Sequence, residues 1–327
     1  MIITQAPFRM SFFGGGSDFV HYFEENPAAV LSTTINKYCY VTVRELPPFF
    51  NYQTHLSYSK TEQVNQVDEI VHPAVREAMR WFDLKRIRLI YDSDLPAQTG
   101  LGTSSSFAVA MLSAFYELRG EKIDVRRLAD EAIYLERTLC DEAGGIQDQI
   151  AAAFGGFNRI DFSKEGYQVQ PVQFAPGKKR QLGDNLLLFF THFTRRSSDI
   201  QKDASSFLAN KKSQLAEMVN LVDQAESILA SSERCLSEFG HLLNHSWQLK
   251  RGLNDRISTS EIDDLYERAC RAGALGGKLL GAGGGGFLLF YVEPQYQEQV
   301  CQTLKGLLQI PFNFEPAGVS TLFSDAT

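Results

Sequence analysis

Several short segments of the chain carry the residue patterns of β-strands. Residues 86–95 (RIRLIYDSDL) alternate between apolar and polar positions, and residues 39–46 (CYVTVREL) are rich in residues that favour strands. The apolar run within residues 183–193 (GDNLLLFFTHF) predicts a buried strand, and residues 286–293 (GFLLFYVE) contain the clearest strand near the end of the chain.

Other segments carry apolar residues at the spacing of a helix. These segments are 72–82, 108–120, 124–143, 146–156, 211–231 and 261–280. Gly120 closes the second of them, and Asp124 stands where an N-cap is expected at the start of the third. Because strands and helices both occur along the whole chain, we expect an α+β protein.

The length of 327 residues is enough for two domains of roughly 150 residues each. The segment 174–185 (FAPGKKRQLGDN) is polar and rich in turn-forming residues, so we place a domain boundary within it. The sequence therefore predicts an N-terminal domain over residues 1–180 and a C-terminal domain over residues 181–327.

Composition and charge limit the classes of partner. Apolar residues make up 44% of the chain, and the net charge is -7. No block of five basic residues occurs, which argues against nucleic acid or an anionic membrane as the main partner. No segment approaches the roughly 20 apolar residues of a membrane helix, and the first residues do not resemble a signal peptide. The five cysteines are scattered, which indicates reduced thiols, so we expect a cytoplasmic protein.

Residues 95–107 (LPAQTGLGTSSSF) place two glycines and a run of four consecutive hydroxyl residues between a predicted strand and a predicted helix. The first turn of a helix offers unpaired N–H groups and the positive end of the helix dipole. Glycines let the backbone approach a ligand, and hydroxyls can bond phosphate or ligate Mg²⁺. A single Ser or Thr would indicate only a cap, but this run exceeds what a cap requires. We interpret the segment as a phosphate-binding loop.

A second glycine-rich segment, residues 281–286 (GAGGGG), has the spacing of the dinucleotide-binding motif. That motif follows a strand and opens a helix, whereas this segment follows a predicted helix and precedes a predicted strand. The dinucleotide interpretation therefore fails. Two interpretations stay open, a tight turn from helix to strand and a loop that approaches a ligand closely.

A third glycine cluster lies within residues 6–19 (APFRMSFFGGGSDF), where Arg9 and Asp18 flank three glycines in an apolar frame. This arrangement favours a positioned polar site over solvated surface charges. The chain lacks the P-loop motif and the protein-kinase signatures. His241 and His245 have helical spacing, but no further ligand stands near them in the sequence, which favours ordinary helix residues over a metal site.

The three glycine motifs, in this order, resemble those of the GHMP kinases, although Gln98 stands where the family often has glycine. The resemblance spans residues 7–287 and implies an N-terminal domain like domain 2 of ribosomal protein S5 and a ferredoxin-like C-terminal domain. The segments GGGSDF, GGIQDQIAAAFGGFN and KLLGAGGGGFLLFY are most similar to the D-glycero-D-manno-heptose 7-phosphate kinases. Fucokinases are similar over the same segments.

The resemblance also implies roles for particular residues. The ATP phosphates are expected at Pro96, Gly100, Leu101, Gly102, Thr103, Ser104 and Ser105. The Mg²⁺ ligands are expected to be Ser104 and Glu136, the latter twelve residues before Asp148. Asp148 is expected to act as the catalytic base beside Arg9. The substrate contacts are expected at Gly15, Gly16, Ser17, Asp18, Arg195, Gly283, Gly284 and Gly285.

The reaction implied is transfer of the γ-phosphate of ATP to the anomeric hydroxyl of a heptose 7-phosphate, which gives the 1,7-bisphosphate. The 7-phosphate needs a cation, for which Arg195, Arg196 and Lys37 are the candidates. Another sugar 1-kinase and a nucleotide-binding regulator without catalysis are the alternatives. The presence of Arg9, Glu136 and Asp148 argues against the regulator. The expected partners are ATP and a phosphosugar, and a homodimer is one option for the assembly.

Overall fold

The structure is a computed structural model, and it describes residues 1–193 and 211–325. Its described strands form two sheets. The larger sheet has nine strands, namely β1 (Ile2–Phe13), β2 (Ala28–Glu45), β3 (Thr54–Ser57), β4 (Thr61–Val64), β5 (Ile87–Ser93), β6 (Phe157–Ser163), β7 (Gly166–Pro171), β12 (Phe314–Glu315) and β13 (Ser320–Ser324). Pairing is antiparallel except between β3 and β5, which are parallel.

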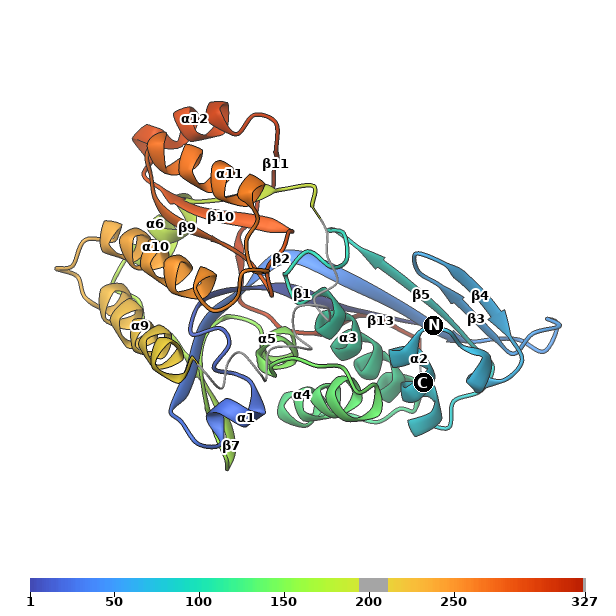
Figure 1. The fold of residues 1–327 in the computed structure, drawn as a ribbon. Coiled ribbons are helices and arrows are strands. Elements are labelled where there is room, and N and C mark those ends of the chain that lie inside the picture. The colour runs from blue at the N-terminus through green and yellow to red at the C-terminus, as the bar shows by residue number, and fades with distance from the viewer. Residues whose placement is uncertain (194–210, 326–327) are drawn as a thin grey trace.

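The smaller sheet has four antiparallel strands in the order β11-β8-β10-β9. Its members are β8 (Leu186–Phe190), β9 (Ala274–Leu279), β10 (Phe287–Val292) and β11 (Leu308–Gln309). The helices that follow β8 in the described chain are α9 (Lys212–Ala230), α10 (Ser237–Arg251), α11 (Ser260–Arg271) and α12 (Pro294–Thr303). Figure 1 shows α10, α11 and α12 beside this sheet, at the opposite end of the molecule from β3 and β4.

The remaining helices of the described chain precede β8. They are α1 (Val20–Phe23), α2 (Pro73–Trp81), α3 (Thr103–Leu118), α4 (Val125–Tyr134), α5 (Gln147–Phe154) and α6 (Lys178–Asp184), with a short 3-10 turn at Val67–Glu69 and a π-helical turn at Leu135–Leu139. Figure 1 shows α3, α4 and α5 together beneath the long strands β1 and β2. The expected α+β class is confirmed.

The core of the larger sheet forms where α3 packs against β1 and β2. Most residues of α3 are buried, because its sequence is apolar around most of its circumference rather than along one stripe. Phe8, Met10 and Phe12 on β1 are also fully buried. Two side-chain bonds join α3 to β1, since the Thr4 hydroxyl donates to the Ala110 carbonyl over 2.8 Å and the Ser106 hydroxyl donates to the Pro7 carbonyl over 2.9 Å. The helix that follows the predicted phosphate loop is therefore held firmly in the core.

The prediction of one helix over residues 261–280 is wrong at its C-terminal end. The helix α11 ends at Arg271, and Ala274–Leu279 form the strand β9. Gly273 has φ +114, a conformation that ends a helix and favours glycine. A Cβ at Gly276 would lie 2.1 Å from the Gly240 carbonyl oxygen, so glycine there allows α10 to pack closely on the strand. Residues 281–286 thus join two strands rather than a helix and a strand.

The last two strands bear on the expected division of the chain. β12 pairs with β2, and β13 pairs with β1, so residues 314–324 lie in the larger sheet. The other strands of the larger sheet all precede β8. The smaller sheet consists of β8 and the strands β9, β10 and β11 that follow it. We propose two domains divided near residue 180, with the segment 314–324 completing the sheet of the first domain. In the described part of the chain, no helix is long and apolar enough to cross a membrane.

The loops at the start of α3 and between β9 and β10 interlock through glycines. A Cβ at Gly100 would lie 2.3 Å from the Leu280 carbonyl oxygen, and one at Gly281 would lie 2.2 Å from the Gly100 Cα. Both glycines have positive φ, +83 and +74. Residues with a side chain would be strained at these positions and would force the loops apart. The two glycine-rich motifs therefore fix the position of one sheet relative to the other.

Candidate active site

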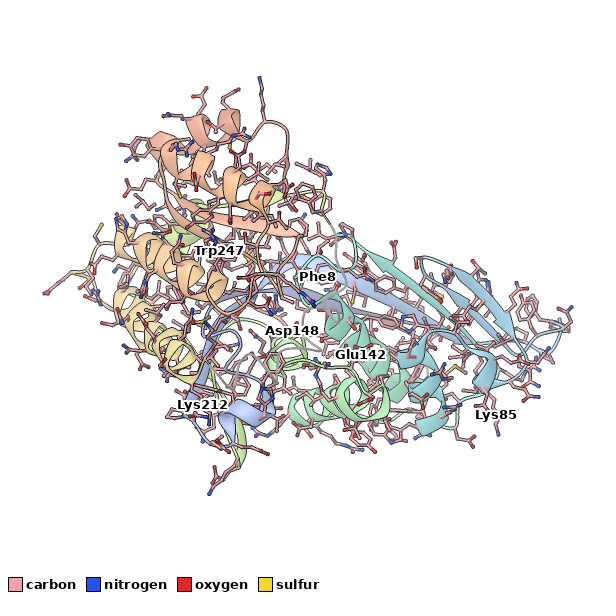
Figure 2. All side chains as sticks on the ribbon, viewed as in Figure 1. Phe8, Lys85, Glu142, Asp148, Lys212 and Trp247 are labelled. Atoms are coloured by element: carbon pink, nitrogen blue, oxygen red, sulfur yellow. The ribbon has the colours of Figure 1, made fainter. Side chains whose placement is uncertain are left out.

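Arg9 and Asp148 form a paired set of hydrogen bonds near the centre of the molecule, where Figure 2 labels Asp148. The Arg9 Nε lies 2.7 Å from Asp148 Oδ1, and its Nη2 lies 2.8 Å from Oδ2. The Arg9 side chain is only 5% exposed, whereas Asp148 is 24% exposed. Two parallel bonds fix the orientation of the carboxylate. Each carboxylate oxygen keeps further acceptor capacity for a ligand.

Arg9 also connects this pair to the loop that precedes α3. Its Nη1 donates to the Gly100 carbonyl over 2.7 Å, and its backbone N–H donates to the Leu101 carbonyl over 3.0 Å. A Cβ at Gly102 would lie 3.2 Å from Arg9 Cγ and 3.4 Å from Asp148 Oδ2. Glycine at position 102 therefore leaves the room in which Arg9 and Asp148 meet.

The first turn of α3 has the geometry of an anion site. Gly102 is the N-cap in the left-handed conformation, and Thr103 begins the helix. The first bond within the helix runs from the Ser106 N–H to the Gly102 carbonyl. The N–H groups of residues 103–105 therefore precede the helical bonding pattern and point toward the loop. Leu101 is buried and anchors this loop, whereas Pro96 lies exposed at its beginning.

Glu136 is buried beside the hydroxyls of the same turn. Its Oε1 accepts a hydrogen bond from Ser104 over 2.6 Å, and its Oε2 accepts one from Ser105 over 2.7 Å and another from Gln149. Glu136 lies in the π-helical turn after α4, and it is only 2% exposed. The predicted helix 124–143 is thus interrupted at this turn, and π-helical turns of this kind are frequent at functional sites.

Asp18 lies in the wall of the same pocket as Asp148. Its carboxylate accepts hydrogen bonds from the backbone N–H groups of Gly16, over 3.0 Å, and Gln147, over 3.3 Å. Burial raises the pKa of Asp18 above its usual value, and the nearby Asp148 raises it further. The hydroxyl of Ser17 donates to the carbonyls of Gly14 and Ala29, so Ser17 supports the turn rather than facing open space.

A single pocket is lined by the Arg9–Asp148 pair and by Asp18. Five of the residues predicted from the sequence line it, namely Arg9, Gly15, Gly16, Asp18 and Asp148. The sequence reasoning missed five other polar lining residues, namely Ser11, Arg137, Gln147, Lys250 and Lys278. Lys278 opens the glycine motif KLLGAGGGGF, which could have drawn attention to it. Lys250 stands in an ordinary helical segment, and no pattern in the sequence distinguishes it.

Two lysines of this pocket are held in backbone contacts. The Lys278 ammonium donates to the Phe12 carbonyl over 2.7 Å, and the Lys250 ammonium donates to the carbonyls of Leu279 and Gly281. Burial, together with the charge of Arg9, lowers the pKa of Lys250 to about 7. Burial also lowers the pKa of Lys278, and Lys250 adds to that shift.

Other predicted residues lie away from the pocket or cannot be placed. A Cβ at Gly283 would overlap Ile257, and one at Gly285 would overlap Phe193. The N–H of Gly284 donates to the Ile257 carbonyl, and the pocket wall is formed instead by Gly281 and Ala282. Arg195 and Arg196, which were predicted to contact the substrate phosphate, lie outside the described residues.

Lys37 and the histidine pair can be placed. Lys37 lies on β2 and is not part of the wall of this pocket. His245 contacts Glu217 over 2.8 Å. Within residues 1–193 and 211–325, no group of three His, Cys, Asp or Glu residues could hold a metal ion. The interpretation of His241 and His245 as ordinary helix residues stays a prediction.

A buried guanidinium–carboxylate pair beside an anion-binding helix start is an arrangement suited to transfer of a phosphoryl group. The chain matches two family models, the GHMP kinases N terminal domain over residues 67–156 and the GHMP kinases C terminal domain over residues 225–307. The chain belongs to the GHMP kinase family, so it is a phosphotransferase, and its family membership implies ATP as the phosphoryl donor.

Three relatives indicate its position within the family. A D-glycero-alpha-D-manno-heptose 7-phosphate kinase from Campylobacter jejuni is 29% identical over 98% of both chains. An L-fucokinase/L-fucose-1-P guanylyltransferase from Bacteroides fragilis is 30% identical over 62% of this chain and 22% of its own length. A crystal structure of a D-glycero-D-manno-heptose 1-phosphate kinase from Bacteroides thetaiotaomicron superposes with a TM-score of 0.78, at 25% identity over 99% of both chains.

The raised pKa of Asp18 predicts a pH-dependent cost of keeping this carboxylate in the folded protein. Above pH 3.8, its ordinary value, the unfolded chain releases the Asp18 proton while the folded chain still holds it. Stability therefore falls as the pH rises from 3.8 through the raised value. We expect the free energy of unfolding of Asp18→Asn, minus that of wild type, to increase between pH 4 and pH 7, as measured by denaturant unfolding.

The exposed Asp255 offers a matched control, because Asp255→Asn removes a carboxylate that lies at the surface. The difference in free energy of unfolding between Asp255→Asn and wild type should change little between pH 4 and pH 7. A difference between Asp18→Asn and wild type that stays constant from pH 4 to pH 7 would contradict the raised pKa.

Proposed function

We propose that the chain transfers the γ-phosphate of ATP to the anomeric hydroxyl of D-glycero-D-manno-heptose 7-phosphate and forms the 1,7-bisphosphate. The observation that carries this proposal is the Arg9–Asp148 pair, which lies between the start of α3 and the pocket that contains Asp18. Similarity to a heptose 7-phosphate kinase along nearly the full length of both chains supports the choice of acceptor.

In the proposed reaction, Asp148 accepts the proton of the acceptor hydroxyl while that oxygen forms its bond to the γ-phosphorus. The bond between this phosphorus and the bridging oxygen of ADP breaks, and ADP leaves with the electron pair. Arg9 holds the Asp148 carboxylate by two bonds, and its charge also faces the transferring group. Asp18 is placed to accept hydrogen bonds from other hydroxyls of the sugar.

Ser104 and Glu136 fit the donor set of a magnesium ion, since both present oxygen atoms and Glu136 is a buried carboxylate whose described partners are uncharged donors. A bound Mg²⁺ would neutralise charge on the phosphates of ATP. The exposed Ser104 hydroxyl and the Glu136 Oε1 would hold it, while Ser105 and Gln149 orient the second carboxylate oxygen.

A fucose- or galactose-type sugar 1-kinase is the second candidate, and the similarity to an L-fucokinase favours it. The two candidates share the reaction centre and differ in the acceptor. The names of the two heptose-kinase relatives also differ in the position of the phosphate, so the position phosphorylated by this chain has to be determined directly.

An acceptor panel tests the proposal. We expect kcat/KM to be highest for D-glycero-D-manno-heptose 7-phosphate among this sugar, the unphosphorylated heptose, fucose, galactose and mevalonate. The loss of one charge-assisted contact predicts a preference of about ten- to a hundredfold over the unphosphorylated heptose. ADP release gives the rates, and ³¹P NMR of the product gives the position of the new phosphate. Equal or higher kcat/KM for fucose or galactose would overturn the assignment.

The magnesium assignment predicts a shared phenotype for Ser104→Ala and Glu136→Gln. Each change removes an oxygen ligand from a hard cation, so each should raise the Mg²⁺ concentration that gives half-maximal rate. Glu131→Gln is the control, because Glu131 on α4 bonds to Tyr116 and Arg127 instead. A Mg²⁺ titration of either site variant that coincides with those of wild type and Glu131→Gln would remove that residue from the metal site.

A further inference from the structure

The pocket next to Asp148 contains more positive charge than its carboxylates balance. Arg9 is matched by Asp148, and Asp18 is satisfied by backbone N–H groups. Lys250 and Lys278 face the same pocket, yet among the described residues neither ammonium lies within 4 Å of a carboxylate. A buried cation without a counterion is costly. An anionic ligand would supply the missing charge.

Lys278 is the more deeply buried of the two, with 3% of its surface exposed. It comes from β9, and its bond to the Phe12 carbonyl places the ammonium beside β1. Lys250 comes from the last turn of α10, and its bonds hold it at the loop that joins β9 to β10. The charge of Lys250 adds to the lowering of the Lys278 pKa.

A second observation also points to a ligand. The hydroxyl of Ser11 and the side-chain oxygen of Gln147 are buried in the pocket wall without any hydrogen-bond partner. Ser11 is 7% exposed and Gln147 is 8% exposed, so bulk water does not compensate them. Ser11 directly precedes Phe12, whose carbonyl binds Lys278. An unpartnered hydroxyl and an unmatched ammonium thus occupy adjacent positions on the same side of the pocket.

The backbone leaves room between these groups. Gly15 has an ordinary φ, and a Cβ there would lie 3.6 Å from the Ser11 Oγ and 3.8 Å from the Gln147 Nε2. These are normal contact distances, so glycine is not required at position 15 by strain or overlap. A side chain would instead occupy the space between Ser11 and Gln147. The absence of one keeps that space open for a ligand.

We propose that Lys250, Lys278 and the Ser11 hydroxyl form the subsite that binds the phosphate group of the acceptor, remote from the hydroxyl that reacts. This inference rests on the proposed function, because it requires a phosphorylated acceptor. It gives the second phosphate a location within the described chain, without the predicted contact of Arg195. Lys278 and Lys250 donate to the phosphate oxygens, and Ser11 donates a third hydrogen bond.

The kinetic test uses Lys250→Met, Lys278→Met and Ser11→Ala, with heptose 7-phosphate and the unphosphorylated heptose as acceptors. Each lysine variant should lower kcat/KM for the phosphorylated sugar by about ten- to a hundredfold, the effect of losing a hydrogen bond to a charged group. The unphosphorylated sugar and the KM for ATP should change by less than about threefold on the same scale. Ser11→Ala should act in the same direction with a smaller effect.

Two controls separate binding from folding. Lys178 is also a buried lysine that donates only to carbonyls, those of Ile228 and Arg234, and it lies outside this pocket. Lys178→Met should therefore leave the acceptor preference unchanged. Ser11→Ala removes a hydroxyl that has no partner, so its free energy of unfolding should equal or exceed that of wild type. A lower preference in a variant of undiminished stability cannot come from misfolding.

Proton uptake gives a measurement that needs no turnover. Free Lys250, with a pKa of about 7, is mostly neutral at pH 8, and a bound dianion should raise that pKa. The other charged groups that line the pocket are Arg9, Asp18, Arg137, Asp148 and Lys278. Calorimetry of acceptor binding in buffers of different ionisation enthalpy should show proton uptake for heptose 7-phosphate at pH 8. The unphosphorylated sugar should lack it, and Lys250→Met should show less of it than wild type, because Lys278, whose pKa burial also lowers, can still take up a proton.

The outcomes distinguish this inference from the proposed function. If wild type shows no preference for the phosphorylated heptose, the proposed function fails first. If wild type shows the preference and both lysine variants retain it, the subsite is wrong and the phosphate is bound elsewhere. If the lysine variants slow both acceptors equally, the lysines act on the transferring phosphoryl group, which also overturns the inference.

Discussion

The contact between Arg9 and Asp148 is the interaction on which the rest of the site depends. Arg9 comes from β1, where it pairs with Thr34 of β2, and Asp148 comes from the first turn of α5. The same guanidinium binds the Gly100 carbonyl in the loop before α3. One side chain therefore positions the proposed base relative to the proposed phosphate-binding turn. Removing either partner of such a buried pair is costly, because the other charge is left uncompensated.

The glycines around this pair have a structural explanation that differs from simple loop flexibility. Gly102 makes room for Arg9 and Asp148, and Gly100 and Gly281 allow two loops to touch. These loops belong to different sheets, so their contact sets the distance across the pocket. Several groups in the pocket are arranged at a cost to the free protein, among them Asp18 with its raised pKa and the two lysines with lowered ones. An anionic ligand would offset the part of that cost that comes from the two lysines, as is common where function and stability compete.

The sequence indicated which residues meet at the candidate site better than it indicated where the elements end. Glycine spacing and the resemblance to a family singled out Arg9 and Asp148, which form an ion pair, and Glu136, which bonds to Ser104; their roles in the reaction are proposed. Local patterns could not reveal that residues 314–324 return to the larger sheet, since strand pairing depends on distant segments. The apolar spacing of residues 274–279 fits helix and strand alike, and packing against α10 decides for a strand. The sequence did not indicate Lys250, because nothing in the sequence of a polar helix shows that one of its lysines is buried.

The most direct test of this account is a double-mutant cycle on Arg9 and Asp148, measured as kcat with saturating ATP and heptose 7-phosphate. Asp148→Asn should lower kcat by about two to four orders of magnitude, as expected for the loss of a general base. If the two side chains act as one unit, Arg9→Met should have a far smaller effect in the Asp148→Asn background than in wild type, with a coupling of about tenfold or more. Losses that multiply to within about a factor of two would show that the residues act independently and would contradict the account.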